Sequence, residues 1–188
     1  MFTGGGTPGP WQGQGVLAVI PGGSIAFGDG NLLEVDQGGA WRATRLPNSS
    51  VVESLVFSSP THAFAYTQHV GLGPRMVEVY QTENGGTTWD RVNAFHPGSS
   101  TTLESILAVP GGYVGTASFN VEAEPLLPPL PVEESPDGVH WHPLSLLPAS
   151  FLPIGAAPGP GSTLWLSGTL GQDQGQLGWV NGAGFHPA

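Results

Sequence analysis

The chain of 188 residues contains no cysteine and no lysine, and only 10% of its residues are charged. Without cysteine, neither a disulfide framework nor a zinc–thiolate site can form. Four arginines stand against 14 acids, and the resulting net charge of −10 disfavours binding to nucleic acid or to an anionic membrane surface. No apolar run reaches the roughly 20 residues of a membrane helix. The first residues, Met-Phe-Thr-Gly-Gly-Gly, lack the basic and apolar regions of a signal peptide.

Glycine and proline are abundant instead, with 30 and 19 residues. Such a composition approaches that of low-complexity chains. However, 39% of the residues are hydrophobic and six are tryptophan, which is enough apolar surface to stabilise a packed core. The absence of lysine and the shortage of other strong helix formers exclude an all-helical fold. The composition therefore predicts an all-β chain with many Gly/Pro turns.

A short turn motif occurs four times, each time as Asp or Asn, then glycine, then an aromatic residue. The aromatic residues are Trp41, Trp89, Trp141 and Phe185, separated by 48, 52 and 44 residues (41 to 89, 89 to 141, 141 to 185). A second set of turns, each after a short apolar run, keeps the same phase at Pro21, Pro60, Pro110 and Pro158. Two sets in phase indicate a repeat of about 48 residues.

Each part of the motif has a physical reason. The Asp or Asn side chain accepts hydrogen bonds from backbone N–H groups further along the chain, which makes a local turn. The glycine supplies a positive φ at little cost. A Ser or Thr two positions earlier can add a further hydrogen bond, and the aromatic residue begins the next strand and buries a large apolar surface.

Four short strand-like runs fit between successive motifs, for example 51–57, 62–67, 76–81 and 89–95. Four strands in each of four repeats predict a β-propeller of four four-stranded blades. The expected organisation is a single domain, 1–188, with repeats at about 15–47, 48–97, 98–148 and 149–188. Residues 1–14, which include Trp11, are a candidate ring-closing strand.

The turns resemble Asp-boxes, the S/T-x-D-x-G-x-x-W element also called the bacterial neuraminidase repeat. Similar turns occur in sialidases, xyloglucan-degrading enzymes, sortilin-type receptors and photosystem assembly factors. The resemblance implies that each turn joins the third and fourth strands of a blade and that its role is structural, and it favours an extracellular or cell-envelope location. The residues that carry it are Asp36, Gly38 and Trp41; Thr82, Asn84, Gly86 and Trp89; Ser135, Asp137, Gly138 and Trp141; and Asn181, Gly182 and Phe185.

Four blades are fewer than the six or more that most members of these families have. Three arrangements remain open: a small propeller that closes by itself, a domain of a larger chain, and a ring completed by a second copy, which would make the protein a homo-oligomer. All three meet the need to hide the edges of a sheet.

Catalytic chemistry has one candidate pair. Glu53 and Glu104 occupy equivalent places in the innermost runs of adjacent repeats, where both carboxylates can face the central channel. They are the candidates for an acid/base pair or a cation site, although repeat homology in a wetted channel lining is the favoured explanation. Sialidase activity is not expected, because all four arginines lie between positions 42 and 91 and no triad can be drawn from around the ring.

No metal site or other cofactor is expected. His140 and His142 share a strand face, but the other histidines of the repeat diverge around the ring, whereas a metal needs at least three converging ligands. Calcium is considered only at two acidic, glycine-rich turns, 29–31 and 171–175, neither of which has the alternating acids of a dedicated loop.

The stretch 121–131 fits the repeat least. Its prolines favour an extended polyproline II conformation that leaves three leucines available to a partner. The candidate binding residues are Glu124, Pro125, Leu126, Leu127, Pro128, Pro129 and Leu130. The sequence thus predicts a non-catalytic binding or scaffolding module that contacts a protein or a glycan through its loops. The alternatives are a glycan-active hydrolase that uses Glu53 and Glu104, and a purely structural domain.

Overall fold

The computed structural model describes residues 15–36, 38–46, 50–69, 76–95, 101–119, 131–148, 151–160, 163–170 and 174–188. The candidate ring-closing segment 1–14 and the candidate binding residues 124–130 lie outside these ranges. Sixteen strands and no helix are present in the described residues, so none of these residues forms a helix that could span a membrane.

Blade 1 contains β1 (Val16–Val19), β2 (Ile25–Asp29), β3 (Leu32–Asp36) and β4 (Trp41–Arg45). Blade 2 contains β5 (Ser50–Phe57), β6 (Ala63–His69), β7 (Val77–Thr82) and β8 (Asp90–Phe95). Blade 3 contains β9 (Thr101–Val109), β10 (Gly112–Phe119), β11 (Pro131–Ser135) and β12 (His142–Leu146). Blade 4 contains β13 (Phe151–Pro158), β14 (Leu164–Leu170), β15 (Gln174–Asn181) and β16 (Gly184–Pro187).

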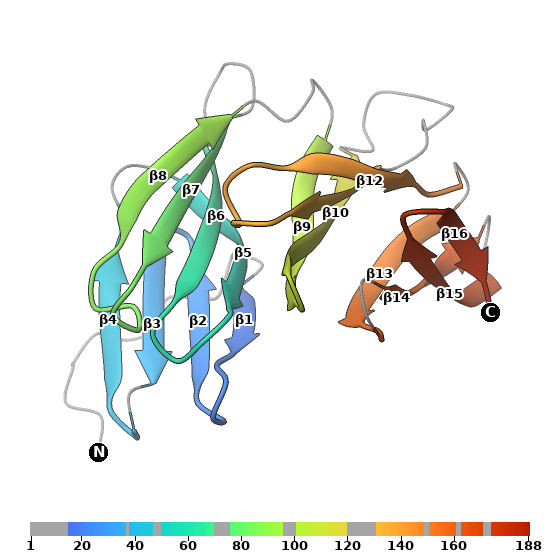
Figure 1. The fold of residues 1–188 in the computed structure, drawn as a ribbon. Helices are drawn as coiled ribbons and strands as arrows, with labels where there is room; N and C mark the ends of the chain where they lie inside the picture. Colours follow the sequence, from blue (N-terminus) through green and yellow to red (C-terminus); the bar gives the residue numbers. More distant parts are fainter. Residues whose placement is uncertain are drawn as a thin grey trace.

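Each blade is an antiparallel sheet whose strands are hydrogen-bonded in chain order. The four sheets follow one another along an arc, from blade 1 (blue) to blade 4 (red) in Figure 1. The prediction of an all-β, four-bladed propeller is therefore confirmed. Since antiparallel strands reverse direction at every turn, the first and third turns of a blade lie at the same end. The two sets of turns that define the repeat consequently share one face of the propeller.

The core consists of three clusters, each of which joins two consecutive blades. The first contains Val35 of blade 1 and Leu55 of blade 2, the second Tyr66 of blade 2 and Ile106 of blade 3, and the third Val132 of blade 3 and Leu166 of blade 4. None of the three joins blade 4 to blade 1 within the described residues. Most of the burial thus comes from contact between neighbouring sheets.

In blades 2, 3 and 4 the aromatic residue of the turn packs onto the preceding blade. Trp89 packs on the cluster between blades 1 and 2, Trp141 on that between blades 2 and 3, and Phe185 on that between blades 3 and 4. No blade precedes Trp41 within the described residues, and 47% of its surface is exposed. The expectation that every motif aromatic buries a large surface is wrong for Trp41, because the side chain lies on the side of blade 1 opposite the cluster shared with blade 2.

The innermost strands of blades 2, 3 and 4 each contain a bulge near their first residues. The pairing of β5 with β6 skips Glu53, that of β9 with β10 skips Glu104, and that of β13 with β14 skips Ile154. An extra residue in one strand bends it and redirects the local side chain. The sequence equivalence of Glu53 and Glu104 is therefore also an equivalence of backbone geometry.

Candidate functional site

The four innermost strands meet at a central pocket of about 240 Å³. All four blades contribute side chains, and most of these are apolar. The lining residues are Val16, Leu17, Glu53, Ser54, Leu55, Ile106, Leu107 and Ala156. This volume is below the roughly 300–1,000 Å³ of most small-molecule sites, and it matches one amino-acid side chain or a single sugar ring.

Glu53 is the acidic residue that lines this pocket. It is partly buried, and it also interacts with other groups of the chain. Glu104 occupies the matching bulge on β9, but its side chain lies outside the described part of the structure. Glu53 at the channel remains the basis of the site.

The predicted turns connect the third and fourth strands of each blade, and the one in blade 3 is held by Asp137. The Oδ1 atom of Asp137 accepts hydrogen bonds from the backbone N–H of Val139 at 2.9 Å and of His140 at 2.8 Å. The Ser135 hydroxyl donates to the same carboxylate at 3.1 Å and accepts from the N–H of Gly138 at 2.9 Å. Both polar side chains therefore satisfy backbone groups of the turn itself.

The Asp137 carboxylate also forms an ion pair with His140, at 2.7 Å from Nδ1 to Oδ2. Burial acts to raise the pKa of the Asp137 carboxyl, but the hydrogen bonds from His140, Val139 and Ser135 outweigh it and hold the pKa below its usual range. The carboxylate of Asp137 is therefore engaged by groups of its own turn.

The turn of blade 2 uses Asn in place of Asp. The Asn84 Oδ1 atom accepts from the N–H of Thr88 at 2.9 Å, and the Thr82 hydroxyl accepts from the N–H of Gly86 at 2.9 Å. Thr82 is almost fully buried. Within the described residues, the turns of blades 1 and 4 each have one such bond, from Gly39 to Asp36 at 2.7 Å and from Ala183 to Asn181 at 2.8 Å.

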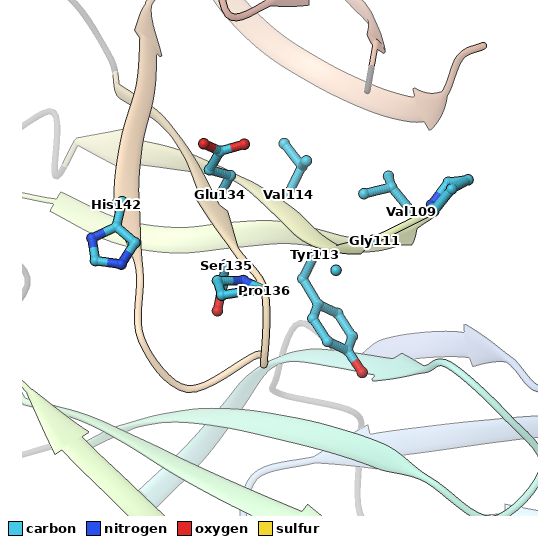
Figure 2. A pocket seen from close by; sticks show the side chains of 10 residues that line it. Val109, Gly111, Tyr113, Val114, Glu134, Ser135, Pro136 and His142 are labelled. Atoms are coloured by element: carbon cyan, nitrogen blue, oxygen red, sulfur yellow. The ribbon is translucent and has the colours of Figure 1, made fainter. Parts of the chain in front are cut away.

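Grooves form on the propeller face that carries these turns. One of about 440 Å³ lies between the turns of blades 1 and 2, and one of about 420 Å³ lies between those of blades 2 and 3. A third, of about 390 Å³, is lined by blade 3 alone, including Tyr113, Glu134 and His142. Figure 2 shows that the phenol of Tyr113 and the carboxylate of Glu134 point to opposite sides. Because these polar groups do not converge, this groove lacks the geometry of a catalytic pair.

Two polar clusters were not predicted. In the first, His62 contacts Ser58 Oγ at 2.7 Å, Glu83 at 3.4 Å and the Tyr113 hydroxyl at 3.5 Å. Ser58 also binds the backbone carbonyl of His62, so the contact belongs to the first turn of blade 2. The sequence signal that could have predicted this cluster is Ser58, which stands four residues before His62 in a turn that contains Pro60.

The second cluster is centred on Glu78, a buried acid of β7. Its carboxylate accepts hydrogen bonds from Arg91 at 2.7 Å and from the Tyr80 hydroxyl at 2.9 Å. Burial, followed by the bond to Glu78, raises the pKa of Tyr80 to about 12. Nothing in the sequence of β7 itself indicates that Arg91, on the neighbouring strand β8, pairs with Glu78.

The described arginines lie on outer strands, remote from the central pocket. Arg91 on β8 is paired with Glu78, Arg42 on β4 donates to Thr87 Oγ1 at 3.1 Å, and Arg45 on β4 donates to Asn31 Oδ1 at 3.2 Å. This arrangement does not supply an arginine clamp at the channel. In the described residues no group of three or more His, Asp or Glu side chains is placed to hold a metal ion.

Two turns, 29–31 and 171–175, were the candidates for calcium. In the turn 29–31, the side-chain oxygen of Asn31 is bonded to Arg45, a cation. In the turn 171–175, residues 171–173 lie outside the described ranges.

Strands β10 and β11 flank residues 120–130. The end of β10 and the start of β11 lie at the face of the propeller opposite the motif turns, and the bulge at Glu53 lies at that same face.

Comparison with known proteins supports the fold. No family model matches the chain, and no curated protein matches it in sequence. Among solved structures, YCF48 bound to D1 peptide matches with a TM-score of 0.59 and 14% identity, over 95% of this chain and 56% of that one. An α-L-arabinanase of Penicillium chrysogenum complexed with arabinobiose matches with a TM-score of 0.56 and 12% identity, over 90% of this chain and 64% of that one.

Both of these proteins are β-propellers, so the comparison agrees with the sheet topology. The present chain spans less than two thirds of either of them. At 12–14% identity the likeness concerns the fold alone. One of these structures holds a peptide and the other a sugar, and one of the two proteins is an enzyme.

Proposed function

We propose that the chain is a non-catalytic binding module that takes up a side chain of a partner protein in its central pocket. The observation that carries this proposal is the pocket itself, about 240 Å³ in volume, apolar over most of its lining and provided with one described carboxylate, Glu53. A volume of this size suits one anchoring side chain better than the several sugar rings of a glycan chain.

The charge of the chain indicates the chemistry of the anchor. With a net charge of −10 the protein attracts cationic partners at long range. A long basic side chain can place its methylene stem against Leu55 and Ile106 and its charged end near Glu53. A carboxylate has two oxygens and several acceptor sites, so it can accept hydrogen bonds from more than one donor at a time. The preferred ligand is therefore a peptide with an arginine or lysine beside apolar residues.

Residues 124–130 form a second part of this proposal. Their flanking strands β10 and β11 end at the same face as the bulge that carries Glu53. A proline-rich segment at that face would extend the contact with a peptide beyond the pocket. We infer further that the repeated turns are Asp-boxes with a structural role, which the hydrogen bonds of Asp137 and Asn84 support.

A peptide panel with matched neutral and basic positions tests the proposal by fluorescence anisotropy. Peptides with a basic residue should bind, and Glu53→Gln should weaken their binding at least tenfold. Glu83→Gln removes the same charge at an exposed position far from the pocket, and should change the affinity less than twofold. Equal losses in the two variants, or no binding by any peptide, would contradict the proposal.

The alternative is a glycan-active hydrolase, favoured by the equivalent bulges at Glu53 and Glu104. Such an enzyme needs carboxyl groups about 5–9.5 Å apart on the two sides of the scissile bond. A panel of fluorogenic glycosides separates the two functions. Turnover that is abolished by Glu104→Gln would establish the hydrolase and overturn the binding module.

A further inference from the structure

The outward face of blade 1 has the composition of a blade interface, but it packs on no other blade within the described residues. Alternation along the strands places Leu17, Val19, Ile25, Phe27 and Trp41 on the side opposite the cluster shared with blade 2. Leu17 pairs with Phe27 and Val19 with Ile25, so these side chains form a continuous apolar surface over β1 and β2. We call it the leading face.

The same positions in blade 2 show what such a face does. By strand register, Leu17 corresponds to Leu55 and Val19 to Phe57. Leu55 and Phe57 pack on blade 1 and are 6% and 5% exposed, whereas Leu17 and Val19 are 66% and 70% exposed. Chains built from repeats normally cover their ends with polar residues. The leading face is apolar instead, which indicates that something covers it.

Blade 4 presents the reciprocal surface on its outward side. Trp165, Leu177, Trp179 and His186 lie there, opposite the residues that contact blade 3. Trp165 pairs with Trp179, and the Trp179 ring stacks on His186 with centroids 3.9 Å apart. Leu177 is 51% exposed, whereas Leu33, its counterpart in blade 1, is fully buried against blade 2. We call this surface the trailing face.

An unsatisfied polar atom marks the same face. By register His186 corresponds to Arg42, the residue after the motif aromatic. Arg42 donates a hydrogen bond across the interface to Thr87, in the turn of the next blade. The Nε2 atom of His186 is buried and has no hydrogen-bond partner within the described residues. The hydrogen bond that Arg42 makes to the next blade thus has no counterpart at His186 Nε2 within the described residues.

We propose that the leading face of one chain packs on the trailing face of a second copy, so that two copies form one closed ring of eight blades. The contact reuses the geometry of the three interfaces within the chain, and Trp41 then packs on blade 4 of the other copy as Trp141 packs on blade 2. A contact between two different faces closes into a ring only if the rotation fits.

Light scattering coupled to size exclusion tests the proposal with the full chain. The expected mass is twice 19.4 kDa, and on dilution it should fall to the 19.4 kDa of a single chain. Val19→Glu and Leu177→Glu, one on each face, should each give a single chain with an unchanged circular dichroism spectrum. Leu146→Glu alters an equally exposed leucine on β12, away from both faces, and should leave the pair intact.

Mixing the two single-face variants identifies which faces meet. Each variant alone lacks one half of every contact, but the mixture restores one intact contact, between the leading face of the Leu177→Glu chain and the trailing face of the Val19→Glu chain. The mixture should therefore recover a pair that neither variant forms. A single chain at all concentrations, an assembly larger than two chains, or a mixture that stays dissociated would each overturn the proposed ring.

Discussion

Trp141 of blade 3 and Trp41 of blade 1 have the same place in their turns, where the fourth strand of the blade begins, but different surroundings. Trp141 packs on the cluster between blades 2 and 3, edge to face with Tyr66 at 5.8 Å. Trp41 is nearly half exposed. The two side chains are chemically the same, so the neighbouring blade, and not the turn, decides whether the aromatic residue stabilises the fold. Interior and terminal blades should accordingly respond differently to matched substitutions.

The largest difference is expected for the tryptophans themselves. Trp141→Ala should lower the free energy of unfolding by about 3–5 kcal/mol, because it leaves a cavity between two blades. Trp41→Ala should cost less than about 1 kcal/mol while the chain is single. Urea denaturation of both variants in the Val19→Glu background measures the contrast. If both substitutions lowered the free energy of unfolding equally, the turn itself, and not the contact between blades, would account for the stabilisation by the aromatic residue.

The glycines of the same two turns form the next pair. Gly138 and Gly38 both have a positive φ, 74° and 69°, so alanine is strained at either place. A Cβ atom at Gly138 would lie 2.5 Å from the Phe64 ring of blade 2, whereas at Gly38 nothing lies within 4 Å. Gly138→Ala should cost about 2–4 kcal/mol and Gly38→Ala about 1–2 kcal/mol. Thermal melts of the two variants would reject the interpretation if Gly38→Ala were the more damaging.

The capping carboxylates should differ by less. Asp137→Ala removes bonds to two backbone N–H groups and to Ser135, and should cost about 1–2 kcal/mol. Asp36→Ala removes the bond from Gly39 and should cost about 0.5–1 kcal/mol. Chemical denaturation provides the comparison, and a larger loss for Asp36 would contradict the ranking of the two turns.

The smallest effect is the pH dependence of the blade 3 turn. Because the pKa of Asp137 is lowered on folding, the carboxylate stabilises the folded state above its unfolded pKa of about 3.9, and this contribution is lost as the pH falls toward the folded pKa. Asp137→Asn keeps an acceptor, as Asn84 does in blade 2, but does not titrate. The stability difference between wild type and Asp137→Asn should shrink as the pH falls from about 5. A difference that is constant over this range would argue against the lowered pKa.

Much of the architecture could be predicted because it depends on interactions between residues close together in the sequence. The Asp or Asn, glycine and aromatic residues of each turn act over a few residues, and their phase with the prolines gives the number of strands and blades. The bulge at Ile154 has no such local signal, since isoleucine fits an ordinary strand. The burial of Glu78 also has no local sequence signal, because its partner Arg91 lies thirteen residues later, on the neighbouring strand.

The candidate site was predicted less completely than the fold. The repeat placed Glu53 and Glu104 in equivalent positions, and the structure adds that both stand at bulges and that Glu53 lines the pocket at the channel. The size and apolar character of that pocket come from Leu17, Leu55, Ile106 and Ala156, which lie on four different strands. A linear pattern does not show how such side chains converge, so the shape of the site required the tertiary structure.

Fluorine NMR of the chain labelled with 5-fluorotryptophan tests most directly whether neighbouring blades decide the fate of equivalent residues. Substitution of Trp41 and Trp141 by phenylalanine assigns their two signals among the six tryptophans. The Trp41 signal should have the shift of an exposed indole in dilute solution and move to that of a buried one as the concentration rises, while the Trp141 signal stays constant. A Trp41 signal that remains exposed at every concentration, or a Trp141 signal that is itself exposed, would contradict the account.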